Sequence, residues 1–252
     1  MKRLVFAILF FQSILNATSG ATLLGDSFIA IAADGISLTT TSDGKMIVER
    51  PCKIVCEGPA CFFADSTLIA NLGMESDQFI KARAEMRKGG SIRKIAERFN
   101  GEALNLAKLI VAANKGTDPK QYATWLAGDP VFGWQFAGFD SDGVPTLAEK
   151  DITLDKDGEI IPAEIQYIRA MPRSIMQFLM GISGDIQAAL QRDSSIGRVG
   201  LGRSPVTVAE SLVQIEIDAF KGNKSPPVAP PITSVLLTSD GAKRISIGNC
   251  KQ

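Results

Sequence analysis

The stretch that decides the fold is Phe28-Ile-Ala-Ile-Ala-Ala-Asp-Gly-Ile36, an apolar run that ends in an Asp-Gly pair. A short apolar run bounded by a turn signal is typical of a buried strand, and Asp-Gly between two such runs favours a hairpin. The same pair recurs at Asp43-Gly44, Asp142-Gly143, Asp157-Gly158 and Asp240-Gly241. The pattern predicts a protein built largely from antiparallel strands.

Outward from this stretch, similar runs predict strands at residues 27–33, 36–41, 53–56, 61–63, 132–139, 146–154 and 232–238. Apolar residues at helical spacing predict helices at residues 76–87, 91–113, 175–190 and 207–220. This order of elements predicts an α+β layered domain in which helices cover antiparallel sheets. The predicted core comprises Ile29, Ile31, Leu38, Ile95, Phe99, Leu106, Leu212, Ile215 and Leu236.

The composition excludes several classes of function. Of the 252 residues 45% are hydrophobic, and 27 basic residues balance 27 acidic ones. A nucleic-acid-binding protein normally carries a basic excess, so nucleic acid is not an expected partner. The chain has no histidine, which excludes Ser-His-Asp and Cys-His catalysis and every site with histidine ligands. No cofactor is predicted.

The N-terminal segment has the features of a secretory signal peptide. Two basic residues near the start precede an apolar run of about 12 residues that ends at Leu15, which is too short to span a bilayer. Small residues at the following positions predict cleavage after Ala21. Residues 1–21 would then be the signal peptide and residues 22–252 a single mature domain beginning at Thr22. We expect a secreted or periplasmic protein without a membrane anchor; an uncleaved N-terminal stub is the alternative.

The export signal predicts disulfides among the four cysteines, because an even number of cysteines in an oxidising compartment usually forms disulfides. Cys56 and Cys61 flank Glu57-Gly-Pro-Ala60, a turn-like tetrapeptide that would bring them face to face. We therefore expect a Cys56–Cys61 disulfide and a second one between Cys52 and Cys250. The alternative is a zinc site made of all four thiolates, but Cys250 stands apart from the close cysteine pairs that such sites favour. No metal site is predicted.

The order of the elements and several local motifs resemble a proteasome β-type subunit of the N-terminal-nucleophile (Ntn) hydrolase superfamily. The stretch from Phe28 to Ile36 is similar to the family's early strand ending in Ala-Ala-Asp, and Pro51-Cys-Lys-Ile54 resembles the segment that carries its lysine. Later motifs that resemble the family are Phe63-Ala-Asp-Ser66, Gly138-Phe-Asp-Ser-Asp-Gly143 and Ser234-Val-Leu-Leu-Thr-Ser-Asp-Gly241. The resemblance covers roughly residues 22–246.

This resemblance implies a four-layer αββα sandwich and, in active members, hydrolysis of amide bonds by an N-terminal Thr, Ser or Cys. Such an enzyme needs no histidine, because its free α-amine, with an ordinary pKa of about 8, is itself the base. A lysine stabilises the ionised hydroxyl, and a carboxylate holds the lysine in place. A peptide or a small amide is the implied substrate, and the ring assemblies of the family suggest a homo-oligomer.

Carried over residue by residue, the resemblance matches Asp34 to the carboxylate and Lys53 to the lysine. The structural alternatives are a hairpin-turn aspartate and an exposed lysine on a strand. The family's nucleophile lies about sixteen residues before the carboxylate, near Thr18, whereas signal cleavage would expose Thr22. A first hairpin shortened by two residues per strand would absorb this difference. The predicted catalytic residues are therefore Thr22, Asp34 and Lys53.

Two hypotheses about function follow from these residues. The first is an exported threonine-type peptidase or amidohydrolase. The second is an inactive pseudo-enzyme that uses the same sandwich to bind a peptide, a ligand or an envelope partner. The second is favoured by a departure from the family, since Lys224-Ser-Pro-Pro-Val-Ala-Pro-Pro231 stands where active members carry an Asp and a Ser before a glycine. Only the first hypothesis requires the mature chain to start at one particular hydroxyl residue.

Overall fold

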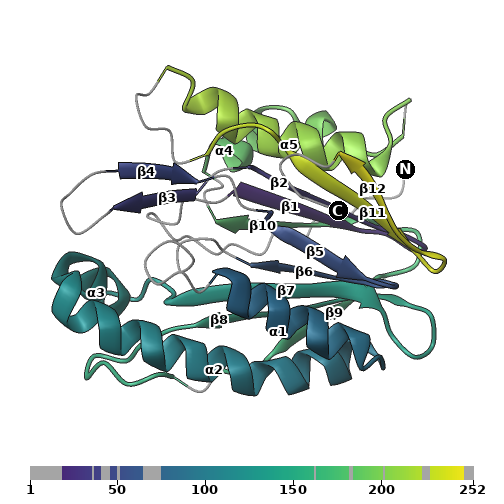
Figure 1. Ribbon diagram of the computed structural model, residues 1–252. Helices are drawn as coiled ribbons and strands as arrows, with labels where there is room; N and C mark the ends of the chain where they lie inside the picture. Colours follow the sequence, from purple (N-terminus) through teal and green to yellow (C-terminus); the bar gives the residue numbers. More distant parts are fainter. Residues whose placement is uncertain are drawn as a thin grey trace.

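The computed structural model describes residues 19–35, 37–40, 46–49, 52–64, 75–161, 163–181, 184–200, 202–222 and 228–246. Two five-stranded antiparallel sheets form the centre of the molecule (Figure 1). The first sheet has the order β10-β1-β2-β11-β12, made of β1 (Ser19–Leu24), β2 (Ile29–Ala33), β10 (Met176–Gly181), β11 (Thr233–Thr238) and β12 (Gly241–Ser246). The second follows chain order, with β5 (Ile54–Glu57), β6 (Ala60–Ala64), β7 (Phe132–Phe139), β8 (Pro145–Ile152) and β9 (Gln166–Arg169). A separate hairpin pairs β3 (Ser37–Thr40) with β4 (Met46–Glu49).

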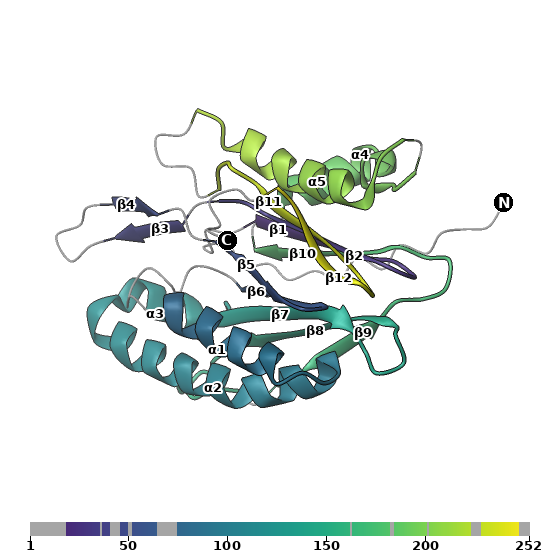
Figure 2. The same ribbon diagram turned by 45° about the vertical axis from the view of Figure 1, so that its right-hand side comes forward.

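Helices cover the outer face of each sheet, which produces four layers (Figures 1 and 2). They are α1 (Glu75–Arg87), α2 (Ile92–Thr117), α3 (Pro119–Leu126), α4 (Gly184–Arg192) and α5 (Pro205–Ala219). α5 packs on the first sheet with α4 beside it, and α1 and α2 pack on the second. The starts of α2 and α5 are set by serine caps, since Ser91 accepts a hydrogen bond from Lys94 N and Ser204 accepts one from Thr207 N.

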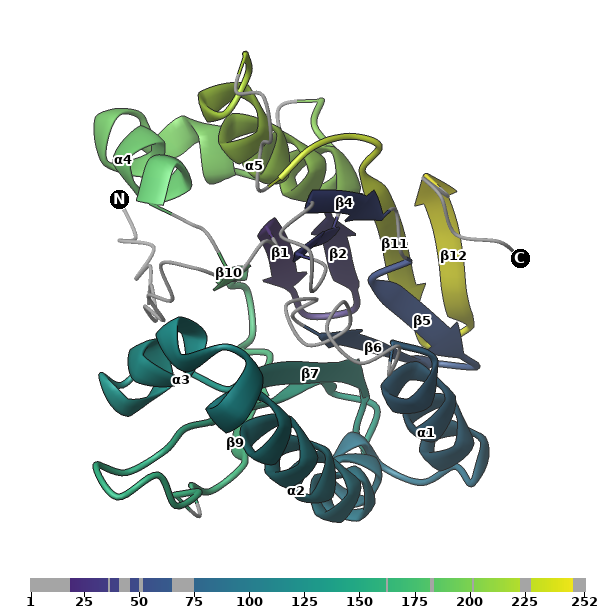
Figure 3. The same ribbon diagram turned by 60° about the vertical axis from the view of Figure 1, so that its left-hand side comes forward.

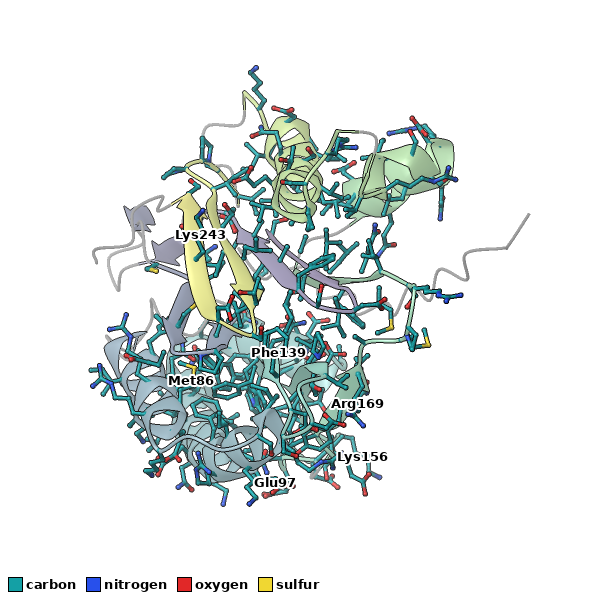
Figure 4. All side chains as sticks on the ribbon, turned by 90° about the vertical axis from the view of Figure 1, so that its right-hand side faces the viewer. Met86, Glu97, Phe139, Lys156, Arg169 and Lys243 are labelled. Carbon is teal, nitrogen blue, oxygen red and sulfur yellow. A yellow bond between two sulfur atoms is a disulfide. The ribbon has the colours of Figure 1, made fainter. Side chains whose placement is uncertain are left out.

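Three apolar clusters separate the four layers. One lies between α1, α2 and the second sheet and is built around Phe62, Phe99 and Trp134. Another lies between the first sheet and α4 and α5, and the third lies between the two sheets. Figure 4 shows side chains filling both halves of the molecule, with Lys243 marking the first sheet and Met86 the helical layer beneath the second. The α+β prediction and the four-layer sandwich are therefore confirmed.

The predicted elements are present except at two places, and β4, α3, β9 and β12 were not predicted. Residues 175–190 were expected to form one helix, but they contain β10 followed by α4, because the apolar run in the first half pairs with β1. Asp34-Gly35 does not close a hairpin, because β2 pairs with β1 and β11 and not with β3. In addition, β1 begins at Ser19, three residues before the domain start predicted at Thr22.

The predicted core residues are mostly in place. Side chains that are buried as predicted are Ile29, Ile31, Ile95, Phe99, Leu106 and Leu212. Ile215 and Leu236 are only half-buried and pack at the margin of the cluster beneath α5. The side chain of Leu38 lies outside the described part of the chain.

The cysteines of the β5–β6 hairpin form the predicted disulfide. Cys56 and Cys61 are directly opposite each other, with a Cα–Cα distance of 4.0 Å. Cys52 is disulfide-bonded as well, and its predicted partner, Cys250, lies outside the described residues. Within the described ranges, no helix combines the length and apolar character that crossing a membrane requires.

Candidate active site

The candidate site is built around Asp34, the first residue after β2. Its backbone N–H donates to the Ser19 carbonyl oxygen at 3.0 Å, which continues the β1–β2 ladder by one step. Its carboxylate Oδ1 accepts a hydrogen bond of 2.8 Å from the Ser19 backbone N–H. Asp34 is therefore fixed to the first residue of β1 through both its backbone and its side chain.

Lys53 reaches the same carboxylate from the second sheet. It directly precedes β5, and its Nζ lies 2.7 Å from Asp34 Oδ1, with both side chains fully buried. An unpaired charge in such a place would carry a large desolvation cost, so each partner depends on the other. The structural alternatives, a turn aspartate and an exposed lysine, are ruled out by this burial and pairing.

Gly35 allows the backbone after Asp34 to lie close to the segment that precedes β11. Its N–H donates to the Ala229 carbonyl oxygen at 3.0 Å, and a Cβ added to it would lie 2.2 Å from the Pro231 carbonyl oxygen. Only glycine fits such a close approach of two backbone segments. The Asp-Gly pair is thus explained by packing against the segment before β11.

Thr22 lies elsewhere on β1. It pairs with Ile31 on one side and Phe178 on the other, and its hydroxyl donates to Gln135 Oε1 at 3.2 Å across the space between the sheets. Three residues of extended chain, about 10 Å, separate it from Ser19. The structure therefore brings Asp34 and Lys53 together and does not bring Thr22 to them. Figure 3 shows β1 between β10 and β2 in the first sheet, above β7.

Ser19 is the described residue at the site that the sequence analysis did not single out. It is fully buried, and among the described residues its hydroxyl has no hydrogen-bond partner. The signal that could have found it was the spacing of about sixteen residues before Asp34, which points to Thr18, the neighbour of Ser19 in the sequence. Thr18 itself lies outside the described residues.

A second polar group lies beneath Thr22. Gln135 Nε2 donates to Glu149 Oε2 at 3.0 Å, and Glu149 Oε1 has no hydrogen-bond partner within the described structure. Burial raises the pKa of Glu149 to about 7, and the hydrogen bond from Gln135 opposes this only in part. Thr22, Gln135 and Glu149 therefore form a polar chain between the sheets that is separate from the Asp34–Lys53 pair.

The described residues do not offer a metal centre. They contain no group of three or more Cys, Asp or Glu side chains able to hold a metal ion. The disulfide between Cys56 and Cys61 also uses two of the four thiolates that the zinc alternative required. The chemistry available at the site is a buried ammonium beside a carboxylate, which can stabilise negative charge on a nearby oxygen.

Comparison with known proteins supports the predicted fold but not the predicted family. No protein-family model and no curated protein matches the chain. The solved structures with a similar fold include the Gly-1 mutant of Anbu from Hyphomicrobium sp. strain MC1, at 14% identity and a TM-score of 0.51, covering 91% of this chain and 87% of that one. Anbu from Yersinia bercovieri, described as an ancestral beta-subunit, is 11% identical with a TM-score of 0.52, covering 90% and 87%.

A third similar structure is the Anbu complex from Pseudomonas aeruginosa, solved as a helical assembly, with 13% identity, a TM-score of 0.48 and coverage of 91% and 86%. Identities this low show the fold alone. Assignment to the proteasome β-type subunit family was therefore wrong, because no family model matches and the similarity to Anbu structures is one of fold. What the comparisons show is that this chain has the proteasome-like fold of the Ntn hydrolases.

Proposed function

We propose that this protein hydrolyses amide bonds with an N-terminal hydroxyl nucleophile located at the start of β1. The observation that carries the proposal is the fully buried Lys53–Asp34 pair, whose carboxylate also accepts the Ser19 N–H. A buried ion pair between two sheets contributes little net stability, since its desolvation cost offsets its attraction. Its position at the beginning of a central strand favours a catalytic role.

The nucleophile that this arrangement favours is Thr18. It directly precedes Ser19 in the sequence, the N–H of Ser19 is bonded to Asp34, and Thr18 stands sixteen residues before Asp34. Cleavage after Ala21 would instead remove Ser19, and with it the hydrogen bond to Asp34 and half of β1. We therefore propose cleavage after Ala17 in place of Ala21, with Thr22 as the alternative start to be tested.

The proposed reaction uses the free α-amine as the base. The amine takes the hydroxyl proton, the oxygen attacks the carbonyl carbon of the substrate, and the protonated amine then gives its proton to the leaving amine. The resulting ester is hydrolysed by water activated by the same amine. The Lys53 ammonium stabilises the developing negative charge on the nucleophile, and Asp34 keeps that ammonium in place. A peptide or a small amide is the proposed substrate.

We also propose that the protein is exported. The apolar N-terminal run supports this, and so does the Cys56–Cys61 disulfide, because disulfides persist mainly in oxidising compartments. A homo-oligomer remains a proposal from the fold alone. Fractionation of cells that express the full chain would test the location, and an unprocessed chain in the cytoplasm would contradict it.

Processing and activity can be tested together. The N-terminus of the purified mature chain is determined by mass spectrometry, and hydrolysis of a fluorogenic peptide library is measured for the native chain and for Thr18→Ala and Thr22→Ala. We expect a start at Thr18 and loss of hydrolysis only in Thr18→Ala. A start at Thr22 with loss in Thr22→Ala would establish the alternative nucleophile. Correct processing with no hydrolysis of any substrate would favour a pseudo-enzyme that binds a peptide, a ligand or an envelope partner.

A further inference from the structure

The position of Lys53 depends on a short strand at the edge of the second sheet. β5 has four residues and is paired with β6 alone in the sheet order, whereas Asp34 belongs to the first sheet. Lys53 comes one residue before the first paired step, Ile54 with Phe63. Whatever holds β5 in register therefore also holds the Lys53 ammonium 2.7 Å from Asp34.

Register matters here because successive side chains of a strand point to opposite faces. A slip of one residue between β5 and β6 would exchange the faces of Ile54, which packs between the sheets, and Val55, which packs toward the helices. It would also move the backbone of Lys53 by one residue, about 3.3 Å, along β6 and away from its place beside Asp34. The hairpin is closed by a two-residue turn between Glu57 and Ala60, in which Gly58 has a φ of 55°. Cys56 and Cys61 face each other just inside that turn, and a disulfide between them requires this one register.

A second covalent attachment lies on the other side of the lysine. Cys52, the residue directly before Lys53, is disulfide-bonded too. Lys53 is thus one residue away from one disulfide-bonded cysteine and three residues away from another. The segment that carries Lys53 is therefore held by disulfide-bonded cysteines on both sides of that residue.

We propose that Cys56 and Cys61 are positioning residues for Lys53, so that the Lys53–Asp34 pair is held in its working geometry only in the oxidised chain. The inference rests on the proposed function for its catalytic meaning, but the geometric part stands by itself. Cys61 is fully buried and Cys56 is half-buried, so the sulfur open to attack is that of Cys56. A dithiol reductant would supply two electrons and two protons, leaving two protein thiols and one oxidised reductant.

The test measures how well Lys53 is protected from acylation by a water-soluble succinimidyl ester, read by peptide mass spectrometry. The chain offers an internal control in Lys150, which is 5% exposed and hydrogen-bonded to Asn100 on α2, away from the β5–β6 hairpin. The variant is Cys56→Ser/Cys61→Ser, and the native chain treated with a dithiol is a second sample. Circular dichroism and the unfolding midpoint confirm that each sample is folded.

We expect acylation of Lys53 to become at least about tenfold faster in both samples, while the acylation rate of Lys150 stays the same. A tenfold change corresponds to about 1.4 kcal/mol of lost protection. Equal protection of Lys53 with and without the disulfide would overturn the proposal. An equal rise at Lys53 and Lys150 would also overturn it, because it would show general loosening. Where the native chain hydrolyses peptides, kcat should fall in the variant with KM unchanged. If the native chain is inactive, the labelling result still decides the positioning role.

Discussion

Lys53 and Asp34 join the two sheets of the sandwich through an ion pair in which neither side chain is exposed to solvent. The lysine belongs to the segment entering β5, and the aspartate to the segment leaving β2. The same carboxylate oxygen holds the N–H of Ser19, so three separate segments meet at one atom. This convergence makes the pair the most informative place to probe both stability and activity.

Removing one partner of the pair should be more harmful than removing both. Lys53→Met leaves the Asp34 carboxylate buried without its ammonium, and we expect a loss of about 3–5 kcal/mol in the free energy of unfolding. Asp34→Asn should cost a similar amount. The combined variant should lose less than the sum, which chemical denaturation of the three variants would show. Strict additivity would contradict the direct coupling seen in the structure.

Thr22→Val should separate packing from catalysis. The substitution replaces the hydroxyl with a methyl group of similar size and leaves Gln135 Oε1 without its donor. We expect a destabilisation of about 1–3 kcal/mol, measured by urea denaturation, because a buried acceptor loses its hydrogen bond. Peptide hydrolysis by the folded fraction should be unchanged. Loss of peptide hydrolysis in Thr22→Val would instead identify Thr22 as the nucleophile.

Glu149 should make the stability depend on pH. Its pKa is raised from 4.5 to about 7 in the folded protein, so the folded state binds the proton more tightly than the unfolded state does. Stability from this group is therefore greatest below pH 4.5 and falls as the pH rises from 4.5 through 7, by about 3 kcal/mol in all. Glu149→Gln mimics the protonated form and should remove this dependence. Parallel stability curves for the two proteins between pH 5 and 8 would contradict the prediction.

The Cys56–Cys61 disulfide closes a short loop, so its contribution to stability should be modest. The chain-entropy model gives about 2 kcal/mol for a loop of this size. Cys56→Ser/Cys61→Ser should therefore lower the free energy of unfolding by about that amount, measured under non-reducing conditions. A loss several times larger would mean that the hairpin, and with it the edge of the second sheet, does not form without the bond.

Gly35→Ala tests the close approach beside Asp34. Its Cβ would meet the Pro231 carbonyl oxygen at 2.2 Å, so the two backbone segments must separate, and we expect a loss of about 1–3 kcal/mol. The matched control is Gly101→Ala in α2, where a Cβ meets nothing within 4 Å. That change should stabilise the protein by about 0.5–1 kcal/mol, because alanine is the better helix former. Thermal unfolding of both variants gives the comparison.

The sequence predicted the parts of this fold that depend on local pattern. The run at 28–33, the Asp-Gly turns at 142 and 240 and the long α2 were recoverable, because alternation, turn chemistry and helical spacing are local signals. β10 was mistaken for helix because a buried apolar run without alternation fits either structure, and only pairing with β1 decides between them. A local sequence pattern does not show which strands pair with each other.

Part of the candidate site could also be predicted from the sequence, and part could not. Asp34 and Lys53 were identified by resemblance, and the structure shows them in contact. The position of Thr22 was inferred from a cleavage rule that competes with strand formation for the same residues. Small, uncharged residues suit a signal-peptidase site, and they also suit a central strand such as Ser19–Leu24 that packs closely on both faces. Register, set by Ser19 opposite Asp34, was the missing information.

Because Asp34 and Lys53 come from different sheets, neither sheet contains the reaction centre by itself. A chain that has completed one sheet, or both sheets without stacking them, has no ammonium beside the carboxylate. Under the proposed function, hydrolytic activity would appear only at the last stage of folding, after the most distant contacts in the chain have formed. Such a hydrolase would be silent during synthesis and translocation for two reasons, since the uncleaved signal segment blocks the α-amine and an incomplete fold leaves the nucleophile without its ammonium.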